Sequence, residues 1–195
     1  MSEATPTRRV VVLHGYNAHP GKHWFDWLAA ELAPEGITVF TPALPDSAEP
    51  QLHAWLASAR DAIGTPDDGL VVIGHSLGSI TALKALAALL GPAPGPARLG
   101  GLVLVSGFDR RLANLPGIDG FTVATVDYAP IIRCTRSRRM IVSDDDEIVA
   151  PALSHDLAAA LDAEVTVVPG AGHFCQEDGY TSFPEVARVV RAILA

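Results

Sequence analysis

Gly74-His75-Ser76-Leu77-Gly78 is the stretch of sequence that decides the fold of this chain. The apolar run Leu70–Ile73 precedes it and predicts a buried strand, whereas the Ala- and Leu-rich run Ser76–Leu90 follows it and predicts a helix. The two glycines permit a sharp turn between strand and helix, where any side chain would clash with neighbouring backbone. Such a turn lifts the Ser76 hydroxyl clear of the sheet and places it at a helix N-terminus.

Strand-like and helical stretches alternate along the rest of the chain. Strands are predicted over Val10–Leu13, Ile37–Phe40, Leu70–Ile73, Leu102–Val105, Met140–Val142 and Val165–Val168. Helices are predicted over Lys22–Ala33, Gln51–Ile63, Ser76–Leu90, His155–Leu161 and Glu185–Leu194. Because the strands are β-branched and do not alternate with polar residues, we expect a parallel sheet covered by helices on both faces. A length of 195 residues suits a single α/β domain spanning 1–195.

Composition and charge exclude several classes of protein. Hydrophobic residues make up 49% of the chain and charged residues 18%, which excludes a disordered chain. The net charge is −8, from 14 Lys and Arg against 22 Asp and Glu. An acidic chain has no general electrostatic attraction to nucleic acid or to an anionic membrane surface, so we expect neither as a partner.

The cysteines and the first residues indicate a cytoplasmic protein. Cys134 and Cys175 lie far apart, without the spacing of a zinc knuckle or a redox pair, which favours a reducing compartment. Met1–Arg9 is short and polar and lacks the apolar stretch of a signal peptide. The most apolar window, Leu70–Leu90, is interrupted by charged and glycine residues and is not expected to span a membrane.

A base and an acid for Ser76 are predicted from their place after later strands. A serine hydroxyl is a poor nucleophile without a base, and the base needs an orienting carboxylate. His173 follows the strand Val165–Val168, and the acidic run Ser143–Glu147 follows the strand Met140–Val142. Active sites of open α/β sheets form at this edge, so the order Ser, Asp, His indicates a catalytic triad.

Three carboxylates are candidates for the acid that orients the base. Asp146 is the first choice, because it comes a few residues after the strand and before the apolar pair Ile148-Val149. Asp145 is the second choice, and Asp109, after the preceding strand, is the third. The deciding observation is which carboxylate lies within hydrogen-bond reach of the His173 ring.

The first strand ends at His14-Gly15-Tyr16, which predicts an oxyanion hole. Its expected donors are the backbone N–H groups of Leu77 and Tyr16, and His14 is expected to brace the loop rather than to react. We expect an open, shallow pocket lined by Tyr16 and by three further aromatic residues, Trp24, Phe108 and Phe174. Such a pocket favours short acyl groups or aromatic substrates over long lipids.

Three further features have more than one interpretation. His19 and His23 are four residues apart, but Pro20-Gly21 breaks any helix between them, so a metal site there is disfavoured. The basic cluster of Arg133, Arg136, Arg138 and Arg139 is expected to be a solvated loop, with capture of a substrate carboxylate by Arg133 as the alternative. The long connection 108–138 is expected to be functional or partly helical, and it is the only stretch available for a cap.

Together these residues resemble the α/β-hydrolase superfamily, and within it the small, lidless serine hydrolases of the retinoblastoma-binding protein nine type and their bacterial relatives. The resemblance covers nearly the whole chain. It rests on His14-Gly15-Tyr16, His23-Trp24 with Trp27-Leu28, Gly74-His75-Ser76-Leu77-Gly78, Ser106-Gly107-Phe108, Asp145-Asp146 and Gly172-His173-Phe174.

The resemblance implies a minimal three-layer α/β-hydrolase fold of about six parallel strands without a large lid. It also implies a triad of Ser76, Asp146 and His173 that hydrolyses an ester or small amide, aminopeptidase-like activity included, with no metal and no cofactor. The retinoblastoma-binding sequence of the mammalian member, Leu-x-Cys-x-Glu, is not met by His173-Phe174-Cys175-Gln176-Glu177, so no protein partner is carried over. Two alternatives stay open: another reaction by the same triad, such as a lyase or carbon–carbon bond hydrolase, or a catalytically silent binding protein.

Overall fold

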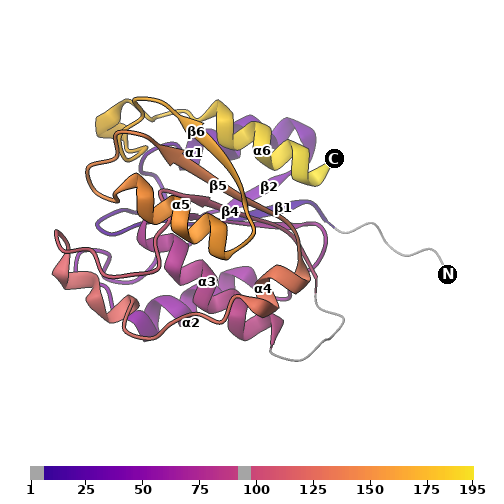
Figure 1. The fold of residues 1–195 in the computed structure, drawn as a ribbon. Helices are drawn as coiled ribbons and strands as arrows, with labels where there is room; N and C mark the ends of the chain where they lie inside the picture. The colour runs from indigo at the N-terminus through magenta and orange to yellow at the C-terminus, as the bar shows by residue number, and fades with distance from the viewer. Residues whose placement is uncertain (1–6, 92–97) are drawn as a thin grey trace.

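Six parallel strands form one sheet in the computed structural model, which describes residues 7–91 and 98–195 (Figure 1). They are β1 (Arg9–Leu13), β2 (Thr38–Phe40), β3 (Leu70–His75), β4 (Leu99–Val105), β5 (Thr135–Ser143) and β6 (Glu164–Val168). Their order in the sheet is β2-β1-β3-β4-β5-β6, and every pairing is parallel. The predicted α/β class with a parallel sheet of six strands is confirmed. Residues 1–6, part of the polar stretch Met1–Arg9 that is not expected to be a signal peptide, lie outside the described residues.

Helices cover both faces of this sheet and give three layers (Figure 1). One face carries α1 (Phe25–Leu32) and α6 (Pro184–Leu194), which enclose one cluster of buried apolar side chains. The other face carries α2 (Leu52–Ile63), α3 (Leu77–Leu90), α4 (Ala129–Cys134) and α5 (Pro151–Ala160), which enclose a second such cluster. Three short 3₁₀ helices, η1 (Ala33–Glu35), η2 (Pro116–Phe121) and η3 (Gln176–Asp178), lie in the connections. Among the described residues, no helix combines the length and the apolar character needed to cross a membrane.

The central strand β3 shows why the strands are unbroken apolar runs in the sequence. All six of its residues are buried. Leu70 and Val72 belong to the cluster under α2 and α3, whereas Val71 and Ile73 belong to the cluster under α1 and α6. Successive side chains of a strand point to opposite faces, and here both faces are covered by helices.

One of two connections differs from the sequence expectation, and the other, 108–138, is partly helical as expected. Helix α1 begins at Phe25 rather than at Lys22, because His23 has a φ of 60° and the chain before it is a turn. The connection 108–138 contains η2 and α4, and its residues Ile118, Phe121 and Ile131 are buried in the cluster that includes α3. Both helical parts of this segment therefore contribute side chains to the core on the α3 side of the sheet.

The turn between β3 and α3 is packed so closely that two of its positions accept only glycine. A Cβ atom at Gly74 would lie 2.6 Å from the Cα atom of Ser79. A Cβ atom at Gly78 would overlap the carbonyl oxygen of Leu13 at the end of β1 and lie 2.8 Å from that of His14. The first turn of α3 thus lies directly against the backbone at the end of β1, which positions the functional site.

We expect Gly78→Ala to destabilise the protein strongly, because the new methyl group has no space unless the backbone of β1 moves away. The free energy of unfolding, measured with urea, should fall by at least about 2 kcal/mol. Gly117→Ala is the matched control, since a Cβ atom there meets nothing within 4 Å. The control should change stability by no more than about 0.5 kcal/mol, and equal effects of the two substitutions would contradict the close approach.

Candidate active site

The loops that follow β1, β3, β5 and β6 meet at the carboxyl edge of the sheet. Ser76 lies at the junction of β3 and α3 with a φ of 55° and a ψ of −122°, a strained conformation for a residue with a side chain. Its backbone N–H donates to the carbonyl oxygen of Val105 at 2.9 Å, which holds the turn against β4. The Ser76 hydroxyl makes no hydrogen bond within the described part of the chain, and it faces a pocket that His173 also lines.

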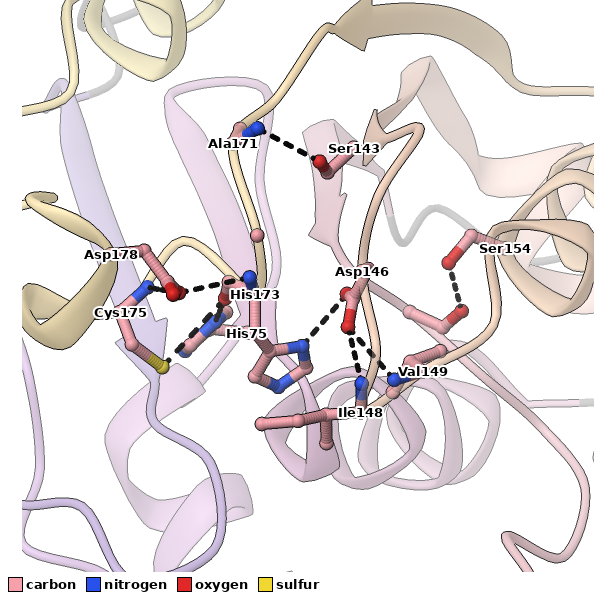
Figure 2. Close-up of polar contacts among 12 residues, drawn as sticks. His75, Ser143, Asp146, Ile148, Val149, Ser154, Ala171, His173, Cys175 and Asp178 are labelled. Atoms are coloured by element: carbon pink, nitrogen blue, oxygen red, sulfur yellow. Dashed lines mark hydrogen bonds and ion pairs between the residues drawn. The ribbon is translucent and has the colours of Figure 1, made fainter.

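His173 and Asp146 form a buried pair on this edge (Figure 2). The ring Nδ1 atom of His173 lies 2.8 Å from Oδ2 of Asp146. The other carboxylate oxygen of Asp146 accepts the backbone N–H groups of Ile148 and Val149, both at 2.9 Å. Burial alone would raise the pKa of Asp146, but the hydrogen bond and charge of His173 and the N–H of Val149 outweigh it and lower the pKa. Asp146 is therefore a carboxylate that accepts a hydrogen bond from the Nδ1–H group of His173.

The other two acid candidates are engaged elsewhere. Asp145 accepts hydrogen bonds from the Ser143 hydroxyl at 2.5 Å and from the backbone N–H of Gly172 at 2.8 Å. Asp109 accepts the Tyr128 hydroxyl at 2.8 Å. Of the three carboxylates that the sequence left open, Asp146 is the one that reaches the His173 ring.

The acidic run holds the histidine loop along its length. The N–H of Gly170 donates to Asp144, that of Ala171 to the Ser143 hydroxyl, and that of Gly172 to Asp145. With the ring contact of His173 to Asp146, four successive residues of one loop bind four successive residues of the other. We call this set of contacts the loop clamp. These contacts fix the position of His173 relative to the end of β5.

Two further side chains hold the main chain of His173, and sequence reasoning did not find them. Asp178 accepts the backbone N–H of His173 at 2.9 Å, and the Nε2 atom of His75 lies 2.8 Å from its carbonyl oxygen (Figure 2). Because a carbonyl only accepts, Nε2 of His75 carries the proton. Burial holds the pKa of His75 well below its usual range, so this ring stays neutral. The position between Gly74 and Ser76 thus links the serine turn directly to the histidine loop.

The two expected backbone donors lie on the loop after β1 and in the first turn of α3. A Cβ atom at Gly15 would lie 3.0 Å from the Cβ atom of Ser76, so this loop runs directly beside the serine. Among the described residues, the N–H groups of Tyr16 and Leu77 donate to no other group. His14 accepts the N–H of Leu44 at Nε2 and therefore donates from Nδ1 to the carbonyl of Gly15. It braces the loop, and burial lowers its pKa and keeps it neutral.

The pocket beside Ser76 has a volume of about 260 Å³ and is lined differently from the sequence expectation. Tyr16 lines it, but Trp24, Phe108 and Phe174 are fully buried in the core and do not. Trp24 and Phe174 pack against Phe183, with ring centroids 5.3 and 4.9 Å apart. The assignment of these three residues to the pocket is corrected, because an aromatic residue near a motif serves the core equally well. Asn114, Leu115 and Ile148 form the apolar and amide part of the wall instead.

The arginine cluster lies away from this edge. Arg133 is in α4 and donates to the carbonyl of Gly91, and Arg138, in the first half of β5, donates to the carbonyls of Leu161, Ile132 and Thr135. Helix α4 leads into the amino end of β5 (Figure 1). This end of the strand is opposite the carboxyl edge of the sheet, where His173 lies. Capture of a substrate carboxylate by Arg133 is therefore ruled out by its position.

Two comparisons of the sequence with known proteins cover nearly the whole chain. The sequence profile of the family described as "Serine hydrolase" matches residues 10–192. A protein of Bacillus subtilis (strain 168) named "Putative hydrolase YdeN" is 35% identical over 184 residues, which cover 94% of this chain and 95% of that protein.

Solved structures show the same fold. The crystal structure of the ydeN gene product from B. subtilis superposes with a TM-score of 0.90 and covers 96% of this chain and 98% of its own. A "putative yden-like hydrolase" from Pectobacterium atrosepticum superposes with a TM-score of 0.68 at 18% identity, over 96% of this chain and 94% of its own. At that identity the second likeness shows the fold alone. The predicted small α/β-hydrolase fold is confirmed.

We expect the pH dependence of stability to report the burial of His23 in the wall of the pocket. Burial, followed by the charge of Lys22, lowers the pKa of His23 to about 4, whereas a histidine in the unfolded chain titrates near 6.5. The unfolded state therefore binds the proton more readily, and stability present above pH 6.5 is lost as the pH falls toward 4. Urea unfolding should lose roughly 1–3 kcal/mol over this range.

His23→Asn should reduce this loss, because asparagine tolerates the positive φ of this position and does not titrate. Its side-chain oxygen also replaces Nδ1 as the acceptor of the Gln176 N–H. His53→Asn, on the exposed side of α2, is the control and should keep the wild-type slope. A His23→Asn protein with the wild-type slope would contradict the assignment.

Proposed function

Because this chain belongs to the serine hydrolase family, we propose that it hydrolyses a carboxylic ester or small amide through an acyl-enzyme formed on Ser76. The observation that carries the proposal is that His173, joined to the buried Asp146 at 2.8 Å, lines the same pocket as Ser76. This is the arrangement of nucleophile, base and orienting acid that acyl transfer needs.

The proposed reaction begins with attack of the Ser76 oxygen on the substrate carbonyl carbon. The Nδ1–H of His173 donates to Asp146, so Nε2 carries the lone pair that accepts the Ser76 proton. Asp146 then stabilises the charged imidazole. In the structure the Ser76 hydroxyl and the His173 ring are not hydrogen-bonded. We expect this hydrogen bond to form when substrate binds.

The tetrahedral intermediate carries its negative charge on the former carbonyl oxygen. The unengaged N–H groups of Leu77 and Tyr16 are the proposed donors to this oxygen. His173 gives its proton to the leaving alcohol or amine as the carbon–oxygen or carbon–nitrogen bond breaks. Water then attacks the acyl-enzyme with the same base, releases the acid and restores Ser76.

The size of the pocket supports small acyl groups. Its volume of about 260 Å³ lies below the usual range for drug-sized ligands. A neighbouring cavity of about 350 Å³ shares Asn114 and Ile148 with it. The Asn114 side chain donates to the carbonyl of Ile148 at 3.0 Å, so this contact lies in the wall that the two cavities share. We propose that it limits the length of the acyl chain.

We also propose that the chain acts in the cytoplasm as a single domain of residues 1–195 on a small-molecule substrate. Both cysteines are free, and the two apolar clusters lie on opposite faces of one sheet. The family implies a small-molecule substrate.

The triad is tested by active-site labelling and by aryl ester hydrolysis. Ser76→Ala should abolish labelling by a fluorophosphonate probe, because the attacking oxygen is gone. Asp146→Asn should lower kcat by about 10³–10⁴, because the imidazole loses its orienting acceptor. Glu147→Gln, an exposed neighbour, is the control and should change kcat by less than about threefold.

Either of two results would favour the alternative functions. A folded wild type that no probe labels would favour a catalytically silent binding protein. A labelled serine with products other than an acid and an alcohol or amine would favour a lyase or a carbon–carbon bond hydrolase.

The acyl-chain limit is tested with a series of p-nitrophenyl esters. The wild type should cleave the acetate and butyrate with at least about tenfold higher kcat/KM than the dodecanoate. Asn114→Ala should narrow this ratio, because it removes the contact between the two cavities. Leu153→Ala enlarges the neighbouring cavity alone and should leave the ratio unchanged. A preference of the wild type for long chains would refute the limit.

A further inference from the structure

We propose that His23, Cys175 and Glu177 bind a zinc ion in the wall of the pocket, and that the bound ion inhibits the enzyme. The binding part stands on the geometry of these three residues alone. The inhibition part rests on the proposed hydrolase function.

Three different donor atoms converge at this place. One nitrogen of His23, the sulfur of Cys175 and one carboxylate oxygen of Glu177 lie within 4.8 Å of one another. The Nδ1 atom of His23 is 4.0 Å from Oε2 of Glu177. Nitrogen, sulfur and carboxylate oxygen are the donor types that Zn²⁺ takes in proteins, and three protein ligands leave a fourth position for water.

Two of the donors are buried or half-buried, and the third is exposed. The His23 side chain is only 4% exposed, and its positive φ fixes the direction in which the ring leaves the backbone. Cys175 is half-buried directly before η3. The Glu177 side chain is 61% exposed, so its carboxylate can move toward an ion held by the other two. Zinc ligands lie at about 2.0–2.3 Å from the metal, so the donors need to close by about 1 Å.

Each of these donors has a contact that an ion would replace or weaken. The Cys175 sulfur lies 3.8 Å from the carbonyl of His173 and accepts the backbone N–H of Asp178 at the start of η3, and Glu177 lies 3.7 Å from the ammonium group of Lys22. Exposed ion pairs of that kind contribute little. Nδ1 of His23 accepts the N–H of Gln176 at 3.0 Å, and this is the one good hydrogen bond that coordination through Nδ1 would replace. The Cys175 thiol would release its proton to solvent when its sulfur binds the ion.

The position of the three ligands explains why a bound ion would inhibit the enzyme. His23, Cys175 and Glu177 line the same pocket of about 260 Å³ as Ser76 and His173. An ion with its water would occupy space that the substrate needs. Its charge would also oppose formation of the imidazolium ion at His173, on which the proposed reaction depends.

The experiment uses the full chain, freed of metal with a chelator and titrated with zinc chloride. Calorimetry should show one zinc ion bound per chain, in the wild type and equally in Ser76→Ala. His23→Asn and Cys175→Ser should each weaken binding at least about tenfold. His19→Asn makes the same change at an exposed position four residues away and should keep wild-type affinity. Cobalt(II) should give a thiolate charge-transfer absorption that Cys175→Ser abolishes.

Activity is measured separately, as labelling by the fluorophosphonate and as aryl ester hydrolysis. Zinc should inhibit both in the wild type, EDTA should reverse the effect, and Mg²⁺ at the same concentration should not inhibit. Zinc affinity unchanged in His23→Asn and Cys175→Ser would overturn the site. Zinc bound at the site without inhibition would overturn the regulatory part alone, and a protein without hydrolase activity would leave the calorimetric result as the test of binding.

Discussion

The close approach of the first turn of α3 to the end of β1 is the constraint on which the site depends. Gly78 lies against the carbonyl of Leu13 so tightly that no side chain fits between them. This contact brings the loop at Gly15 beside Ser76 and places the N–H groups of Leu77 and Tyr16 near the same hydroxyl. The strained φ of Ser76 is maintained because β1, β4 and α3 all hold the turn. The proposed nucleophile and the proposed oxyanion donors are thus consequences of one packing contact.

A second constraint, the loop clamp, positions His173. Carboxylates accept hydrogen bonds only, a serine hydroxyl both accepts and donates, and the backbone of a loop needs acceptors for its N–H groups. Ser143, Asp144 and Asp145 supply acceptors to the backbone N–H groups of Gly170–Gly172, and Asp146 supplies one to the ring of His173. The cost of bringing several negative charges together is offset because each carboxylate has a donor. A loop that would otherwise be mobile is therefore held by the end of a buried strand.

The sequence was sufficient for the sheet, the serine turn and the order of the site residues, because these depend on local patterns. Apolar runs and paired glycines carry their own structural meaning, as β3 and Gly74–Gly78 show. The pocket wall was not predictable in this way. Trp24, Phe108 and Phe174 are apolar, and an apolar residue suits the core as well as a pocket, so only the packing decides. Asp178 and His75 act through contacts to the backbone of His173, for which no sequence signal exists.

The loop clamp joins segments that are made late, whereas the serine turn is complete once α3 has formed. During synthesis from the N-terminus, β1, β3 and α3 can pair while Gly170–His173 is still to be translated. Until those residues are in place, the proposed nucleophile Ser76 has no base. The proposed chemistry therefore depends on β6, the last strand of the chain, pairing with β5 at the edge of the sheet.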